Sequence, residues 1–89
     1  NDIMAMGCLD TLRTEYGVAV PTDIAIVGFD GVEAATWLSY DLTTVSQPLE
    51  RMAHAAVNML LERIEAPELP AEKRLFSGDI RHGSSAVLR

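Results

Sequence analysis

Asp30 is the residue of this sequence best placed to bind a ligand. It follows an apolar run at residues 24–29 and is followed by Gly31, which permits a tight turn. A continuous apolar run is typical of a buried parallel strand, and ligands of open α/β sheets bind beyond the carboxyl ends of such strands. An ionised carboxylate there can accept hydrogen bonds from two hydroxyls, which suits a sugar. The alternative is that Asp30 only caps the short helix after it.

Asn1 is a second candidate for the same edge. It precedes a helical pattern over residues 2–16, and a helix that follows a strand begins at the carboxyl edge of the sheet. Its amide offers both donors and acceptors to a ligand. The alternative is an N-cap that only accepts a hydrogen bond from the first helical turn.

The remaining residue types offer no catalytic arrangement. No nucleophile elbow, phosphate-binding loop, dinucleotide fingerprint or paired carboxylate motif occurs. Cys8 falls on the apolar arc of the first helix, which favours a small buried side chain. One cysteine with the distant His54 and His82 lacks zinc-ligand spacing. We therefore expect no enzymatic activity, no metal site and no cofactor.

Composition limits the class of protein further. The 89 residues are 48% hydrophobic, and 7 Lys and Arg against 13 Asp and Glu give a net charge of −6. These values exclude a disordered chain and a basic nucleic-acid surface. If glycine is not counted as apolar, the longest uninterrupted apolar run has four residues, which excludes a membrane span. The chain opens at Asn1 directly in a helical pattern, so we expect it to be cut from a longer protein.

The candidate residues require an α/β framework to position them. Gly17 ends the first helix, and Pro21 marks a turn before the buried strand. The order of signals predicts, after that strand, a short helix at 32–38, a strand at 42–45, a helix at 48–65 and a broken strand at 74–81.

Both long helices carry more apolar surface than one contact covers. Apolar residues of the 48–65 helix spread over roughly 240° of its wheel, against about 100° for an ordinary surface helix. Ile3 and Met6 give the first helix a second apolar side. We therefore expect the isolated chain to self-associate. Trp37, Leu38 and Tyr40 form an apolar cluster that either adds to such a patch or packs in the core.

Together the landmarks resemble a known family. They are the segments at residues 1–7, 20–30, 42–48 and 81–85, which include Asn1-Asp2-Ile3-Met4-Ala5-Met6-Gly7 and Arg81-His82-Gly83-Ser84-Ser85. This ordered set resembles the C-terminal part of a LacI/GalR-family bacterial transcriptional regulator. The implied fold is a fragment of a periplasmic-binding-protein-like α/β fold, with two lobes of parallel sheet around a cleft.

The resemblance also implies a division of the chain. Residues 1–46 would belong to the C-terminal lobe of the effector-binding domain. Residues 47–70 would form a crossover, with Gln47 as its hinge, and a helix of the N-terminal lobe. Residues 71–89 would supply a return strand to the C-terminal lobe and the tail. The DNA-binding head is absent from this sequence.

By the same resemblance, Asn1 and Asp30 would contact the effector, a sugar or a purine-like molecule. Leu49 is aliphatic where some members of the family carry an aromatic residue, so stacking on a sugar is not expected there. The protein would be a cytoplasmic homodimer that binds DNA only through the head. The expected interface residues are Met6, Leu9, Asp10, Arg13, Trp37 and Leu38.

Three functional hypotheses follow. The leading one is the effector-binding and dimerisation portion of a LacI-type regulator, in which a small ligand controls DNA binding. The alternative is a solute-binding protein of a sugar transporter with the same fold. A third hypothesis, a small stand-alone α/β enzyme, lacks the residues that its chemistry would require.

Overall fold

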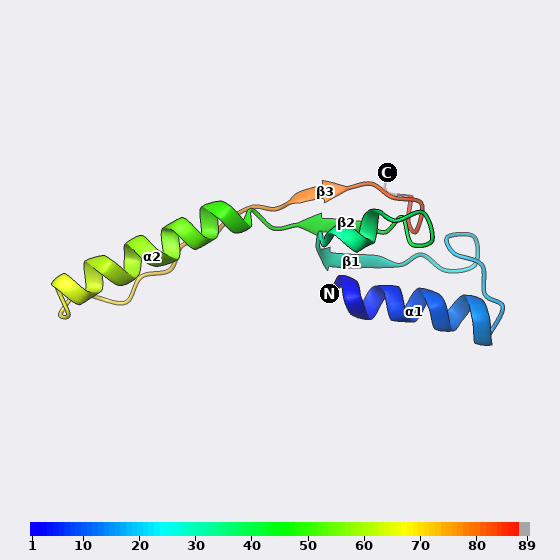
Figure 1. The fold of residues 1–89 in the computed structure, drawn as a ribbon, viewed down its shortest axis with the longest axis horizontal. Helices are drawn as coiled ribbons and strands as arrows, with labels where there is room; N and C mark the ends of the chain where they lie inside the picture. Colours follow the sequence, from blue (N-terminus) through cyan, green and yellow to red (C-terminus); the bar gives the residue numbers. More distant parts are fainter. Residues whose placement is uncertain (88–89) are drawn as a thin grey trace. The chain divides into compact units, whose positions relative to one another are not determined.

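The computed structural model describes residues 1–87, which divide into two units (Figure 1). One unit comprises Asn1–Ser46 and the segment that begins at Gly78, and the other comprises Gln47–Ser77. The first contains α1 (Asp2–Glu15), β1 (Val27–Asp30), the 3₁₀ helix η1 (Glu33–Thr36), β2 (Thr43–Ser46) and β3 (Asp79–Arg81), and the second contains α2 (Leu49–Glu65). This order of elements agrees with the α/β prediction, although the first and last strands are shorter than expected.

The first unit is built on a small mixed sheet. Its strand order is β1-β2-β3, with β1 and β2 parallel and β3 antiparallel to β2. Within this register Asp30 lies beside Ser46, at the carboxyl ends of the two parallel strands. An antiparallel edge strand on a parallel sheet is common in α/β proteins. The parallel pair is therefore the part of the sheet that creates the predicted ligand-binding edge.

Helix α1 packs against β1 through a face that the apolar pattern predicted only in part. Its buried residues are Asp2, Ala5, Met6 and Leu9. The expectation for Cys8 was wrong, because this residue of the apolar arc is exposed. The spacing of the buried residues is helical, but its first member is an acid, and an apolar pattern cannot identify a buried carboxylate. The predicted end of the helix is correct, since Gly17 has a φ of 61°.

The hydrophobic core of this unit lies between α1 and the parallel strands. Ala5 and Leu9 from α1 meet Ala35 from η1 and Leu42, which directly precedes β2. Partly buried residues packed around them are Val20, Ile26, Val32 and Tyr40. Both Leu9 and Leu42 are completely buried, so the core is small but closed.

The sheet is covered on only one side in the described chain. Val27 is 54% exposed, Phe29 51% and Ile80 54%. Val27 and Phe29 alternate along β1 with the buried Gly28, which faces Asp2 of α1, and Ile80 lies in β3. The expectation of a strand buried on both faces is therefore wrong for this chain, because α1 packs on one face only.

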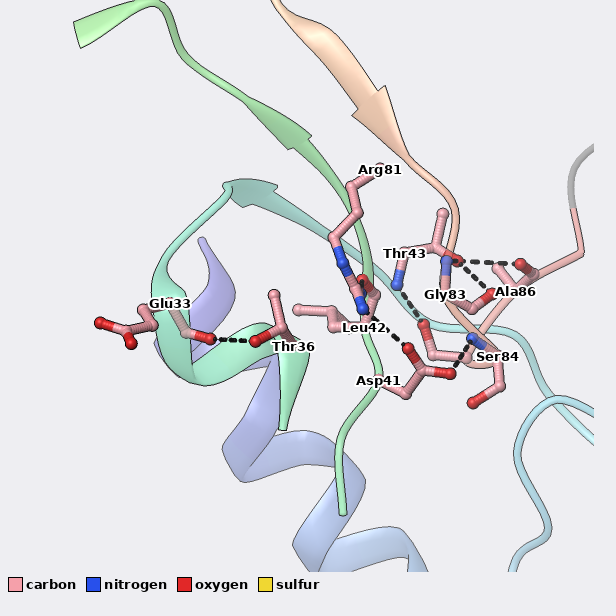
Figure 2. Close-up of polar contacts among 10 residues, drawn as sticks. Glu33, Thr36, Asp41, Leu42, Thr43, Arg81, Gly83, Ser84 and Ala86 are labelled. Atoms are coloured by element: carbon pink, nitrogen blue, oxygen red, sulfur yellow. Dashed lines mark hydrogen bonds and ion pairs between the residues drawn. The ribbon is translucent and has the colours of Figure 1, made fainter. Parts of the chain in front are cut away.

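A polar turn near the C-terminus joins the start of β1 to the start of β2. The Ser85 hydroxyl donates to the Ile26 carbonyl at 2.7 Å and accepts from the Thr43 amide at 2.8 Å. The Thr43 hydroxyl accepts from the Gly83 amide at 2.9 Å and lies 2.9 Å from the carbonyl oxygens of Gly83 and Ala86 (Figure 2). Ser85 thus bonds to both segments just before they pair as strands.

Arg81 and Asp41 stabilise this turn through further hydrogen bonds. The Arg81 guanidinium donates to the Leu42 carbonyl at 2.7 Å and to Asp41 Oδ1 at 2.9 Å (Figure 2). The other Asp41 oxygen accepts from the Ser84 amide at 3.0 Å. Hydrogen bonds hold the pKa of Asp41 below its usual value, with the larger effect from Arg81 and a smaller one from Ser84. The closing Arg81-to-Ser85 segment is therefore a structural clamp.

The second unit consists of α2 and the segment that follows it. Pro48 is the N-cap of α2 and not its first helical residue. Arg63 donates from its two guanidinium nitrogens to the Leu69 and Pro70 carbonyls at 2.8 and 2.7 Å. The Arg51 guanidinium lies 6.0 Å from the centre of the Phe76 ring. These contacts fold residues 66–77 back along the helix.

None of the α2 residues is buried, although a wide apolar arc of this kind is normally covered by other layers. Large apolar side chains more than half exposed are Leu49, Val57, Leu60, Leu61 and Ile64. Within residues 1–87, no helix is long and apolar enough to cross a membrane. Self-association of the isolated chain stays a prediction.

Replacement of Ser85 tests the C-terminal turn. Ser85→Ala leaves the buried Thr43 amide and the Ile26 carbonyl without their hydroxyl partner. We expect a loss of about 1–3 kcal/mol in the free energy of unfolding, measured by urea denaturation. Ser39→Ala, at an exposed serine, is the matched control and should change stability by less than about 0.5 kcal/mol. Equal stabilities of the two variants would contradict the structural role of Ser85.

Candidate functional site

Asn1 and Asp30 lie on either side of one hydrogen-bonded junction. Asn1 is the N-cap of α1, where its side-chain oxygen accepts from the Met4 amide at 2.9 Å, and its side chain is exposed. Asp30 is the last residue of β1 and is partly buried. The junction between them is made by their neighbours, Asp2 and Gly31. The structure therefore brings together the two residues that the sequence predicted for this edge.

The Asp2 carboxylate forms the junction. Its Oδ2 accepts from the amides of Gly31 and Val32, both at 2.8 Å, and its Oδ1 accepts from the Thr44 hydroxyl at 2.6 Å. Both Asp2 and Thr44 are completely buried. One side chain thus connects the start of α1, the turn after β1 and the middle of β2.

A glycine in β1 makes this approach possible. A Cβ atom at Gly28 would lie 2.2 Å from Asp2 Oδ1 and 2.7 Å from a methyl carbon of Leu42, both closer than real atoms allow. An acidic side chain in the first turn of a helix, such as Asp2, is by itself explained by the helix dipole. The signal that could have revealed more was Gly28, since glycine inside a strand marks a close approach of another group.

The backbone at Asp30 is strained. Asp30 has a φ of 135°, and Gly31 follows with a φ of 76°. Only glycine adopts such angles at little cost, whereas another residue there loses about 1–3 kcal/mol of stability. Strain of this kind persists where surrounding contacts enforce it, and it often occurs at binding sites. The strain therefore identifies the Asp30 turn as the most constrained part of this edge.

Ser46 is a polar neighbour that the sequence analysis did not select. It pairs with Asp30 in the sheet, and its hydroxyl donates to the Asp79 carbonyl at 3.2 Å. A Cβ at Gly31 would lie 2.5 Å from the Ser46 Cβ, so the turn passes close to this residue. The edge therefore offers an amide, a carboxylate and a hydroxyl, a set suited to hydrogen bonding with a polyhydroxyl ligand.

Other candidate positions lie outside this edge. Gln47 is the first residue of the second unit, directly after the end of β2, and its hinge role stays a prediction. His54 is exposed on α2 and lines a cavity of about 280 Å³ with Ala53, Val57 and Asn58. A second cavity, of about 300 Å³, lies between α2 and the segment after it, and neither cavity is lined by Asn1 or Asp30. Among residues 1–87, no group of three or more His, Cys, Asp or Glu side chains is placed to hold a metal ion.

The six residues expected at a dimer interface separate into two groups. Leu9 is completely buried and Met6 is 9% exposed, so these two side chains have no surface to offer a second chain. This corrects the expectation for both, because their side chains are buried within their own chain, Leu9 in the core with Ala35 and Leu42. Trp37 is 59% exposed and Leu38 98%, which puts both outside the core.

Two contacts join the loop after η1 to the outer side of α1. Arg13 donates to the Ser39 carbonyl, and the Tyr40 hydroxyl donates to Asp10 Oδ2 at 3.0 Å. The hydrogen bond to Asp10, and its negative charge, raise the pKa of Tyr40. We define the outer surface as Asp10, Arg13, Trp37 and Leu38. The contacts at Ser39 and Tyr40 hold the loop that carries Trp37 and Leu38 against α1.

Comparison with known proteins identifies similar sequences. A family model described as a periplasmic binding protein-like domain matches residues 1–86. The HTH-type transcriptional repressor PurR of Vibrio atlanticus is 43% identical over 76 residues, which are 85% of this chain and 22% of that protein. The repressor of the same name from Photobacterium profundum is 40% identical over 76 residues, with the same coverage. The chain thus spans about a fifth of the length of these curated relatives.

Solved structures show the same similarity. A LacI-type transcription regulator from Bifidobacterium animalis superposes with a TM-score of 0.74 and 39% identity, over 99% of this chain and 31% of that one. A LacI family transcriptional regulator from Enterococcus faecium, determined with bound ribose, gives a TM-score of 0.76 and 29% identity, over 96% and 32% of the two chains.

Two substitutions at Asp30 separate its backbone strain from its side chain. Asp30→Ala and Asp30→Gly both remove the carboxylate, but only glycine accepts a φ of 135° without strain. We expect the Gly variant to exceed the Ala variant by about 1 kcal/mol or more in free energy of unfolding, measured by urea denaturation. An Ala variant at least as stable as the Gly variant would show that the turn is not strained.

Proposed function

We propose a ligand-sensing role for this chain, because it belongs to the periplasmic binding protein-like domain family, within the LacI/GalR group of transcriptional regulators. In this role Asn1 and Asp30 form part of the effector site. The observation that carries the proposal is the buried Asp2 junction, which holds the start of α1 against the turn after β1. The named relatives are repressors, which favours a regulator over a transport protein and over an enzyme.

The effector that best suits this edge is a sugar. A carboxylate accepts hydrogen bonds from adjacent hydroxyls, and the Asn1 amide can both donate and accept. The Enterococcus faecium regulator of similar fold was determined with ribose, which makes ribose the first probe. Adenine, as a purine base, tests the competing class of effector.

In the full-length protein, effector binding would change DNA binding. The first unit would belong to the C-terminal lobe and the second to the N-terminal lobe, with the crossover at Gln47. A ligand held between two lobes biases their closure, and a homodimer can transmit this change to its DNA-binding heads. The coupling is reciprocal, so operator DNA would change effector affinity by the same factor. This role is that of a cytoplasmic protein.

The effector site is tested by removing the Asp30 carboxylate. In the full-length protein, Asp30→Ala should weaken ribose binding by about 1.5–3 kcal/mol, or roughly 10- to 150-fold, because hydrogen bonds to a charged group are lost. Isothermal titration calorimetry measures this change. Glu15→Ala, which removes an exposed carboxylate at the other end of α1, is the control and should leave affinity unchanged.

Two results would count against this function. Equal ribose affinity in Asp30→Ala and wild type would exclude Asp30 from the site. A wild-type protein that binds adenine and not ribose would replace the sugar with a purine, and binding of neither would contradict both effector classes.

We also propose that the outer surface forms the homodimer contact. It combines an exposed tryptophan and leucine with the charged pair Asp10 and Arg13, which is typical of an interface with an apolar centre and a polar rim. It is continuous across α1 and the loop after η1, through the Arg13 and Tyr40 hydrogen bonds.

A charged residue at Leu38 tests the dimer contact. Leu38→Glu places a carboxylate at the most exposed apolar position of this surface, so the full-length protein should shift from dimer to monomer in sedimentation velocity at micromolar concentration. Leu75→Glu is the matched control, since Leu75 is 87% exposed and lies in the other unit. A Leu38→Glu protein that remains dimeric would place the interface elsewhere.

A further inference from the structure

We propose that Asp2 is a positioning residue of the effector site, whose buried carboxylate holds Asp30 in its strained backbone conformation and thereby sets effector affinity. This inference rests on the proposed function, in which Asp30 contacts the ligand. Asp2 is completely buried, so it acts on the ligand only through the turn.

Two backbone amides directly after Asp30 donate to Asp2. The Gly31 amide belongs to the peptide group directly after Asp30, and the Val32 amide to the next one. Both donate to the same oxygen, Asp2 Oδ2, at 2.8 Å. A shared acceptor fixes the orientation of both peptide groups, so the chain on the C-terminal side of Asp30 cannot rotate without breaking two charge-assisted hydrogen bonds.

Strand pairing constrains the backbone on the N-terminal side of Asp30. Strand β1 pairs with β2 from Val27↔Thr43 to Asp30↔Ser46, which fixes the backbone that leads into Asp30. Asp30 therefore lies between two fixed segments, and its φ of 135° is what joins them. A strained angle persists only where surrounding contacts determine it on both sides. If the Asp2 contact is removed, the turn is free to relax.

Thr44 and Gly28 fix the position of the Asp2 carboxylate. Its Oδ1 accepts from the buried Thr44 hydroxyl at 2.6 Å, and Gly28 leaves the space that the carboxylate occupies. Asp2 is also the first residue of α1 and directly follows Asn1. One carboxylate thus fixes both proposed ligand residues in relation to the sheet, which explains why an acid is buried at this point.

The experiment compares Asp2→Ala with Asp2→Asn in the full-length protein. The first readout is the three-bond HN–Hα coupling of Asp30, measured by NMR with ¹⁵N-aspartate labelling. This coupling is small at a φ of 135° and large in an ordinary extended strand. The second readout is the affinity for D-ribose. A purely structural role for Asp2 would change neither quantity in protein that remains folded.

We expect Asp2→Ala to convert the small Asp30 coupling to a large one and to weaken ribose binding roughly tenfold or more. Asp2→Asn should keep the Asp30 coupling and the ribose affinity near their wild-type values. Its amide oxygen can still accept from Gly31 and Val32, while its amide nitrogen faces the Thr44 hydroxyl. The matched control is Asp23→Ala, which also removes a carboxylate that accepts a backbone hydrogen bond, from Ala19 at 2.9 Å. It should change neither readout.

The outcomes separate this inference from the proposed function. A folded Asp2→Ala protein with wild-type coupling at Asp30 overturns the positioning role, whatever its ribose affinity. If Asp2→Ala does not fold, Thr44→Val carries the test, since it removes only the Oδ1 contact and should shift the coupling partway; an unchanged coupling overturns the proposal. If wild-type protein binds no ribose, the sugar assignment fails, while the coupling still decides whether Asp2 constrains Asp30.

Discussion

The buried carboxylate of Asp2 is the interaction on which the arrangement of the first unit depends. It connects α1, the turn after β1 and the middle of β2 through hydrogen bonds to Gly31, Val32 and Thr44. A buried charge is costly unless it is fully hydrogen-bonded, so the carboxylate permits only backbone arrangements that supply these donors. This requirement explains the glycine at position 28 and the tight turn at Gly31.

The polar contacts occupy both ends of the parallel strands and leave the core small. Asp2 organises the carboxyl ends, and Ser85 with Arg81 organises the opposite ends. Between them, Leu9 and Leu42 are completely buried. Stability thus comes from a few satisfied polar groups around a short apolar contact. The ends are consequently rigid, which suits a site that must hold a carboxylate in one orientation.

Each unit has exposed apolar surface, at a different kind of element. On the sheet it is the face opposite α1, including Val27 and Phe29, and on α2 it extends around most of the helix. A strand or helix with such a surface is normally covered by another layer. This chain spans about a fifth of the length of its curated relatives. The polar edge at Asp30 and the exposed apolar face of the sheet are therefore two different surfaces of the first unit.

The sequence alone determined the order of the elements, the N-cap at Asn1, the end of α1 at Gly17 and the position of Asp30 after a strand, because these depend on local signals. It did not reveal that Asp2 is buried while Cys8 is exposed, or that Ser46 lies beside Asp30. Those features arise from contacts between residues far apart in the chain. Only the tertiary structure decides which side of a helix meets the sheet, because that choice depends on which buried polar groups find partners.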